Sequence, residues 1–61
     1  MTKTEAREVA TARKYAAAGM LDTAARSLSA LIRAARTNAS KTELLTEARK
    51  LGADKLPEFI A

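Results

Sequence analysis

Apolar residues recur at the three-to-four-residue spacing of an amphipathic helix along most of this chain. The pattern is clearest between residues 22 and 36. When successive residues are placed about 100° apart, as in an α-helix, the apolar positions of this segment and its flank fall within roughly 120°. They are Leu21, Ala24, Ala25, Leu28, Leu31, Ile32 and Ala35. The segment therefore reads as a helix with one buried face.

Capping residues indicate where a first helix begins and ends. Thr2 is followed three residues later by Glu5, which is the spacing of a capping box. Gly19 then stands where a glycine commonly terminates a helix in the left-handed conformation. These signals predict a helix over residues 3–18.

Two further helices follow from the same signals. Asp22 suits the N-cap of the segment 22–36. Ser40 and Glu43 repeat the capping-box spacing, which predicts a third helix over residues 41–51.

The end of the chain predicts a short final turn. Gly52 suits the C-terminal end of the third helix, and Asp54 suits a cap for a turn over residues 55–60. Few β-branched or aromatic residues are available for a sheet. We therefore expect a single all-α domain over residues 1–61, in which an antiparallel helical hairpin packs against the third helix and the turn.

Alanine dominates the apolar side of the first helix. The chain has 15 alanines among 61 residues, and a methyl group buries little area. One interpretation is that this side packs only within the chain. The other is that it also receives a partner helix, such as a second copy, because so small a domain often needs added support. The residues expected to serve that contact are Ala6, Val9, Ala10, Ala16 and Ala17.

The chain carries 11 Lys and Arg against 7 Asp and Glu, a net charge of +4, and the excess lies in its first two-thirds. Such an excess suggests an anionic partner, either nucleic acid or an acidic protein.

No stretch approaches the ~18 apolar residues of a membrane-spanning helix, so no membrane contact is expected. The chain has no cysteine for disulfides and no evident secretion signal, which makes the cytoplasm the expected location.

The cations of the predicted hairpin follow a pattern. Three in the first helix and two near the end of the second lie on the same flank of their apolar arcs, with one more further round the second helix. In an antiparallel hairpin these flanks share one side, which predicts a basic surface for nucleic-acid phosphates. The residues are Lys3, Arg7, Lys14, Arg26, Arg33 and Arg36.

Two known patterns share the segment between the first two helices. Tyr15, Gly19, Leu21 and Ala24 stand at a spacing that resembles the helical hairpin of tetratricopeptide repeats. That pattern has a large residue and a glycine where this chain has Glu8 and Ala12.

The same segment also resembles a helix-turn-helix, through residues 18–22. That resemblance implies that Arg26, Ser29 and Arg33 face a DNA groove. The two patterns compete for the same residues, and neither assigns a family.

Catalytic chemistry finds little support. The chain has no histidine or cysteine, its two glycines are 33 residues apart, and no base is evident beside its serines. Glu43 and Glu47 share a helical face, but two carboxylates alone make a poor metal site. We therefore expect no catalytic residue, no cofactor and no metal.

The function expected is a small regulatory binding module whose basic face contacts nucleic acid. The alternative is protein–protein interaction or homo-oligomerisation through the alanine-rich face, with incidental charge.

Overall fold

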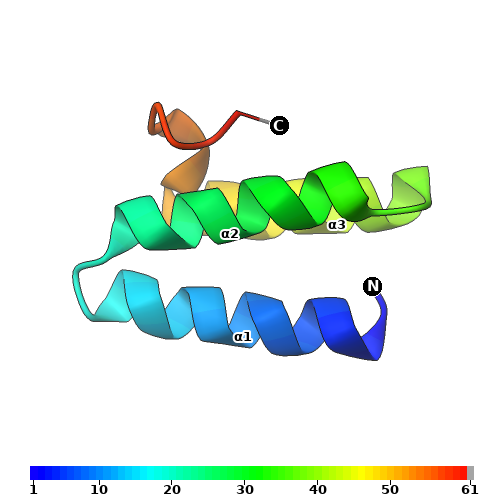
Figure 1. The fold of residues 1–61 in the computed structure, drawn as a ribbon, viewed down its shortest axis with the longest axis horizontal. Coiled ribbons are helices and arrows are strands. Elements are labelled where there is room, and N and C mark those ends of the chain that lie inside the picture. The colour runs from blue at the N-terminus through cyan, green and yellow to red at the C-terminus, as the bar shows by residue number, and fades with distance from the viewer. Residues whose placement is uncertain (61) are drawn as a thin grey trace.

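The computed structural model describes residues 1–60 as three packed α-helices and a short 3-10 turn. The helices are α1 (Lys3–Ala17), α2 (Leu21–Ala34) and α3 (Asn38–Leu51), and the turn is Ala53–Lys55. Each helix runs antiparallel to the one before it, with α3 behind α2 and the last residues above α2 in Figure 1. The prediction of a small all-α bundle is confirmed.

Both predicted signals at the ends of α1 operate as expected. The Glu5 amide donates to the Thr2 hydroxyl at 3.1 Å, and the Thr2 amide donates to the Glu5 carboxylate at 2.8 Å. At the other end, Gly19 has a φ of +84°, which strains any residue with a side chain. Its left-handed backbone turns the chain from α1 into α2.

The ends of α2 differ from the prediction. The helix begins at Leu21, and Met20 occupies the N-cap without a side-chain hydrogen bond. Asp22 therefore lies inside the first turn and does not cap an amide. Its carboxylate interacts favourably with the positive end of the helix dipole. The helix ends at Ala34, two residues before Arg36, because Ala35 adopts an extended conformation.

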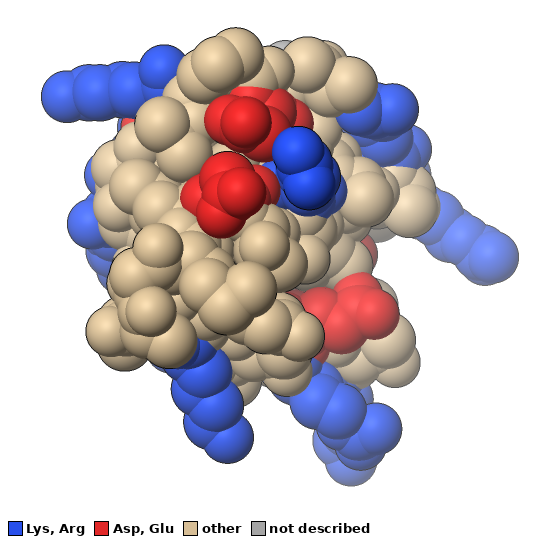
Figure 2. Space-filling view, turned by 60° about the vertical axis from the view of Figure 1, so that its left-hand side comes forward, with Lys and Arg blue, Asp and Glu red and all other residues tan. Residues whose placement is uncertain are grey.

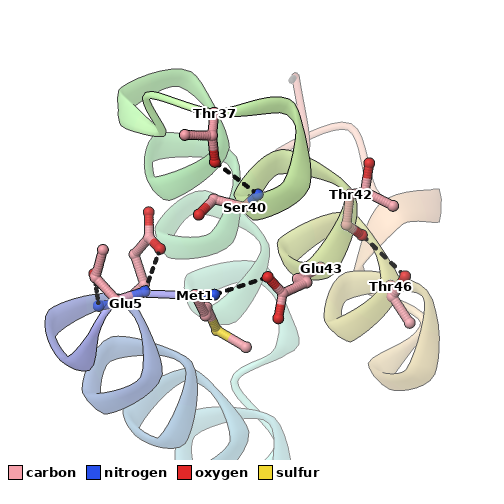
Figure 3. A network of polar contacts seen from close by, with 8 residues as sticks. Met1, Glu5, Thr37, Ser40, Thr42, Glu43 and Thr46 are labelled. Carbon is pink, nitrogen blue, oxygen red and sulfur yellow. Dashed lines mark hydrogen bonds and ion pairs between the residues drawn. The ribbon is translucent and has the colours of Figure 1, made fainter.

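The third helix begins three residues earlier than predicted. Thr37, not Ser40, is the N-cap: its hydroxyl accepts a hydrogen bond from the Ser40 amide at 3.1 Å. Ser40 is consequently buried within the first turn of α3, beside the start of α1 (Figure 3). The helix ends at Gly52, whose φ of +77° matches the expected left-handed termination.

The C-terminal turn lies nearer the N-terminus than predicted, although one hydrogen-bonded turn, from the Phe59 amide to the Leu56 carbonyl at 3.0 Å, falls within residues 55–60. A 3-10 turn forms earlier, at Ala53–Lys55, and Asp54 lies within it instead of capping it. The residues that follow continue across α2 without helical structure. Their backbone is tied down by the Ile60 amide, which donates to the Ser29 hydroxyl of α2 at 3.2 Å.

The core is built largely from methyl groups. Its largest fully buried side chains are Leu28, Leu44, Val9 and Ser29, and the rest of the buried apolar cluster is alanine. Half-buried Leu56 and Phe59 pack against this cluster from the C-terminal segment and close its open end. A core with so few large side chains depends on each of them.

A partly buried ion pair joins α1 to α3. Glu47 of α3 is only 8% exposed, and its carboxylate accepts a hydrogen bond from the Arg13 guanidinium of α1. The Lys50 ammonium lies 3.4 Å from the second carboxylate oxygen. The hydrogen bond from Arg13, assisted by Lys50, holds the pKa of Glu47 below its ordinary range.

Truncation of Leu28 to alanine is expected to remove most of the stability. Large-to-small changes at fully buried leucines cost about 2–5 kcal/mol. A chain of 61 residues has about 3–9 kcal/mol in total at the usual ~0.05–0.15 kcal/mol per residue. Urea denaturation followed by far-UV circular dichroism checks this. Leu31→Ala, at a half-buried position of the same helix, is expected to lose clearly less. Equal losses would contradict the packing described.

Arg13→Met tests the bridge between α1 and α3. The change keeps the apolar stem but leaves Glu47 with Lys50 alone, and an under-satisfied buried carboxylate is expected to cost about 1–2 kcal/mol. Arg49→Met is the control, since Arg49 is exposed and has no ion-pair partner among residues 1–60. That control is expected to stay within about 0.5 kcal/mol of the parent in urea denaturation.

The Glu47 ion pair also predicts an acid-sensitive fold. Because folding lowers the pKa of Glu47 below its ordinary value of 4.5, its contribution is complete above that pH and is lost as pH falls further. Urea midpoints measured from pH 7 down to pH 2 are expected to drop most steeply below about pH 4.5. Glu47→Gln is expected to flatten this profile, whereas Glu8→Gln, at an exposed position, leaves it unchanged.

Candidate nucleic-acid interface

The structure does not bring the six predicted cations together. All six are exposed, but α3 packs against the side of the hairpin on which they were expected to converge. On α1 that side is joined to α3 by Arg13 and Glu47. On α2 it carries Ile32, which lines a shallow hollow with Lys41 and Leu45 of α3. The third helix thus separates the cations of α1 from those of α2.

No cation lines the groove on the opposite side of the hairpin. A groove of about 660 Å³ runs there between α1 and α2, and Tyr15, 37% exposed, forms part of its wall. Glu8 is the charged residue among its lining positions. The lining residues are Glu8, Thr11, Tyr15, Ser27, Ala30, Leu31 and Ala34. Neither side of the hairpin is the continuous basic surface that the helical positions predicted.

Two of the predicted cations lie together elsewhere. Arg26 and Arg33 line a hollow of about 450 Å³ against the C-terminal segment, and Glu58 lines the same hollow. Ser29, between them, is 1% exposed and accepts a hydrogen bond from Arg33 at 3.4 Å. A helix-turn-helix interpretation requires Ser29 to face a DNA groove, and its burial beneath the C-terminal segment contradicts that.

Arg36 lies apart from both groups. It is exposed in the connection between α2 and α3, beyond the end of α2 at Ala34, although the predicted helix included it. Figure 2 accordingly shows Lys and Arg side chains projecting in several directions, with acidic side chains near the centre of that view.

The remaining three cations form one stripe on α1. Lys3, Arg7 and Lys14 lie within about 40° of one another around the helix at 3.6 residues per turn. They point away from Val9 and Ala12, the fully buried residues of α1. All three are exposed, and Figure 1 shows α1 along the lower edge of the bundle.

The predicted alanine face of α1 is divided by the structure. Val9 is buried and Ala16 packs half-buried against the core, but Ala6, Ala10 and Ala17 are exposed. Only Val9, Ala12 and Ala16 point inward. At ~100° per residue, the centre of this buried face lies about 50° around α1 from the centre of the predicted apolar face. The exposed alanines lie beside the cationic stripe.

We call this exposed region the outer face of α1. It combines the three cations, the three exposed alanines and two exposed threonines. The threonines were not among the residues predicted for a site. Thr4 and Thr11 lie about 40–100° further round the helix than the cations, and Thr11 also lines the groove toward α2. Its members are Lys3, Thr4, Ala6, Arg7, Ala10, Thr11, Lys14 and Ala17.

No acidic residue belongs to the outer face. Glu8 lines the groove toward α2. Glu5 is occupied by the capping box, and the hydrogen bond from the Thr2 backbone lowers the pKa of its carboxyl, with the Ser40 hydroxyl contributing (Figure 3). Glu43 accepts a hydrogen bond from the Met1 amino group at 2.7 Å. The outer face therefore holds three positive charges without a neighbouring negative charge from its own helix.

Within residues 1–60, no group of three or more His, Cys, Asp or Glu side chains is placed to hold a metal ion. The comparisons with known proteins add no assignment: no family model, no curated protein and no solved structure matches this chain.

Proposed function

We propose that this protein is a non-catalytic module that binds nucleic-acid phosphates through the outer face of α1. The observation that carries the proposal is the stripe formed by Lys3, Arg7 and Lys14 on a helical face that no other residue of the described range 1–60 covers. From Lys3 to Lys14 the stripe spans about 16 Å at ~1.5 Å per residue. A line of cations this long can contact several phosphates of a nucleic-acid backbone. We expect this binding to take place in the cytoplasm.

The charge of the outer face favours nucleic acid over a second copy of the chain. Two copies that packed through their exposed alanines would bring both stripes together, six cations in all, and like charges across an interface disfavour association. A polyanion encounters the opposite situation, because each phosphate contact releases counterions. The exposed alanines therefore act as a smooth surface beside the cations rather than as a dimer contact.

The same face is poorly suited to a lipid surface. Helices that bind membrane interfaces insert large apolar side chains such as Trp, Phe or Leu, and the outer face has only alanine and threonine between its cations. No helix within the described residues is long and apolar enough to cross a bilayer.

Binding is expected to weaken steeply with salt. Three phosphate contacts predict a slope of about −2.7 in the logarithm of affinity against the logarithm of salt concentration. Affinity for a labelled DNA duplex then falls about 40-fold between 50 and 200 mM salt by that slope. Fluorescence anisotropy titrations at several salt concentrations measure this. The proposal is refuted if no duplex binding occurs at the lowest salt concentration.

Charge removal on the outer face is expected to abolish this binding. Lys3→Gln, Arg7→Gln and Lys14→Gln together lower the net charge from +4 to +1 and eliminate the salt slope. The matched control removes three exposed cations elsewhere, through Arg36→Gln, Lys41→Gln and Arg49→Gln. It has the same net charge and is expected to keep a slope close to the parent's. Equal losses in both triple variants would show that net charge alone drives binding.

A further inference from the structure

The size of the side chains on the outer face of α1 narrows the kind of nucleic acid that fits. Its long side chains are the three cations, and its other members are alanine and threonine, which carry only a methyl or a 1-hydroxyethyl group. An α-helix with average side chains is about 10–12 Å in diameter, so this face lies at the narrow end of that range. The helix backbone can therefore approach a ligand closely.

The outer face has no aromatic residue on which the bases of a single-stranded nucleic acid could stack. Proteins that hold single strands stack bases on aromatic side chains, each worth about 1–3 kcal/mol. Tyr15 lines the groove toward α2, and Phe59 packs half-buried against the core. The outer face offers charge and a close approach, but no stacking surface.

These properties fit one duplex geometry. The major groove of B-form DNA is about 12 Å wide and admits an α-helix, whereas the A-form major groove of RNA is deep and too narrow for side chains to read. Lys3 and Lys14 lie about 16 Å apart along α1 and on the same side of it, so a helix placed obliquely in the groove brings both long side chains to the phosphates that border it. Arg7 lies between them, within reach of the groove itself.

We infer that the ligand of the outer face is B-form duplex DNA, with α1 placed in the major groove. This inference rests on the proposed function and adds to it a preference for one duplex form. Lys3 and Lys14 contact phosphates on the groove walls, and the exposed alanines allow the helix to enter. Bulk added beside the stripe then hinders entry into a groove without affecting the charges.

The first test compares four polyanions at one low salt concentration. They are a DNA duplex, an RNA duplex of the same sequence, the corresponding DNA single strand, and heparin. Anisotropy competition is expected to give the DNA duplex an affinity at least about 10-fold higher than the RNA duplex or the single strand. Equal affinities for the three nucleic acids overturn the inference while leaving phosphate binding intact. Failure of all four to bind refutes the proposed function itself.

The second test adds bulk without changing charge. Ala10→Leu with Ala17→Leu enlarges the outer face, and Ala30→Leu with Ala34→Leu is the matched control on exposed positions of α2. The outer-face variant is expected to lose about 10-fold in DNA-duplex affinity and to keep its heparin affinity, because flexible heparin needs no groove fit. The control is expected to keep both, and far-UV circular dichroism verifies that both variants fold. Undiminished duplex binding by the outer-face variant, or an equal loss toward heparin, overturns the inference.

Discussion

The packing of α3 against α2, completed by the contact of Glu47 with Arg13 of α1, determines which surfaces of this small bundle are free. The ion pair joins α3 to one flank of α1, and α3 covers the side of the hairpin where a basic surface would otherwise form. A carboxylate that is 8% exposed requires a cationic partner, and Arg13 supplies it across the helix interface. With that flank occupied and the opposite flank facing α2, the outer face of α1 is left to solvent.

The same packing of the three helices produces a core made mainly of methyl groups and separates the cations of α1 from those of α2. The helices pack through alanine, with Leu28 and Leu44 as the large buried side chains, so little apolar area stabilises the fold. The polar contacts that remain are correspondingly important. Ser29 is an example: buried in α2, it accepts hydrogen bonds from both Arg33 and the Ile60 amide and so ties the C-terminal segment to the bundle.

Features that depend on a few neighbouring residues were predictable from the sequence. The capping box of Thr2 and Glu5 and the left-handed glycines at 19 and 52 are local, and the structure contains each of them. The start of α3 was misplaced because Thr37 and Ser40 are both competent caps, and only the folded chain chooses between them. The α2 face was predicted well because its leucines and Ile32 define a direction.

The orientation of α1 was not predictable in the same way. Five of its residues are alanine, which is stable both in a core and in water, so an apolar arc drawn through all of them points in an averaged direction. Val9 alone is large enough to mark the true inner side. The burial of Ser29 and Glu47 depends on partners 31 and 34 residues away, which no local pattern contains. The structure therefore keeps three of the predicted cations on one face of α1 and separates them from those of α2.

Backbone amide shift mapping during a DNA-duplex titration is the most direct measurement of the central claim. The account predicts that perturbed amides in the 15N spectrum cluster on α1, around Lys3, Arg7 and Lys14, while those of Arg26, Arg33 and the C-terminal segment stay in place. Perturbations centred on Arg26 and Arg33, or spread evenly over all three helices, would contradict it.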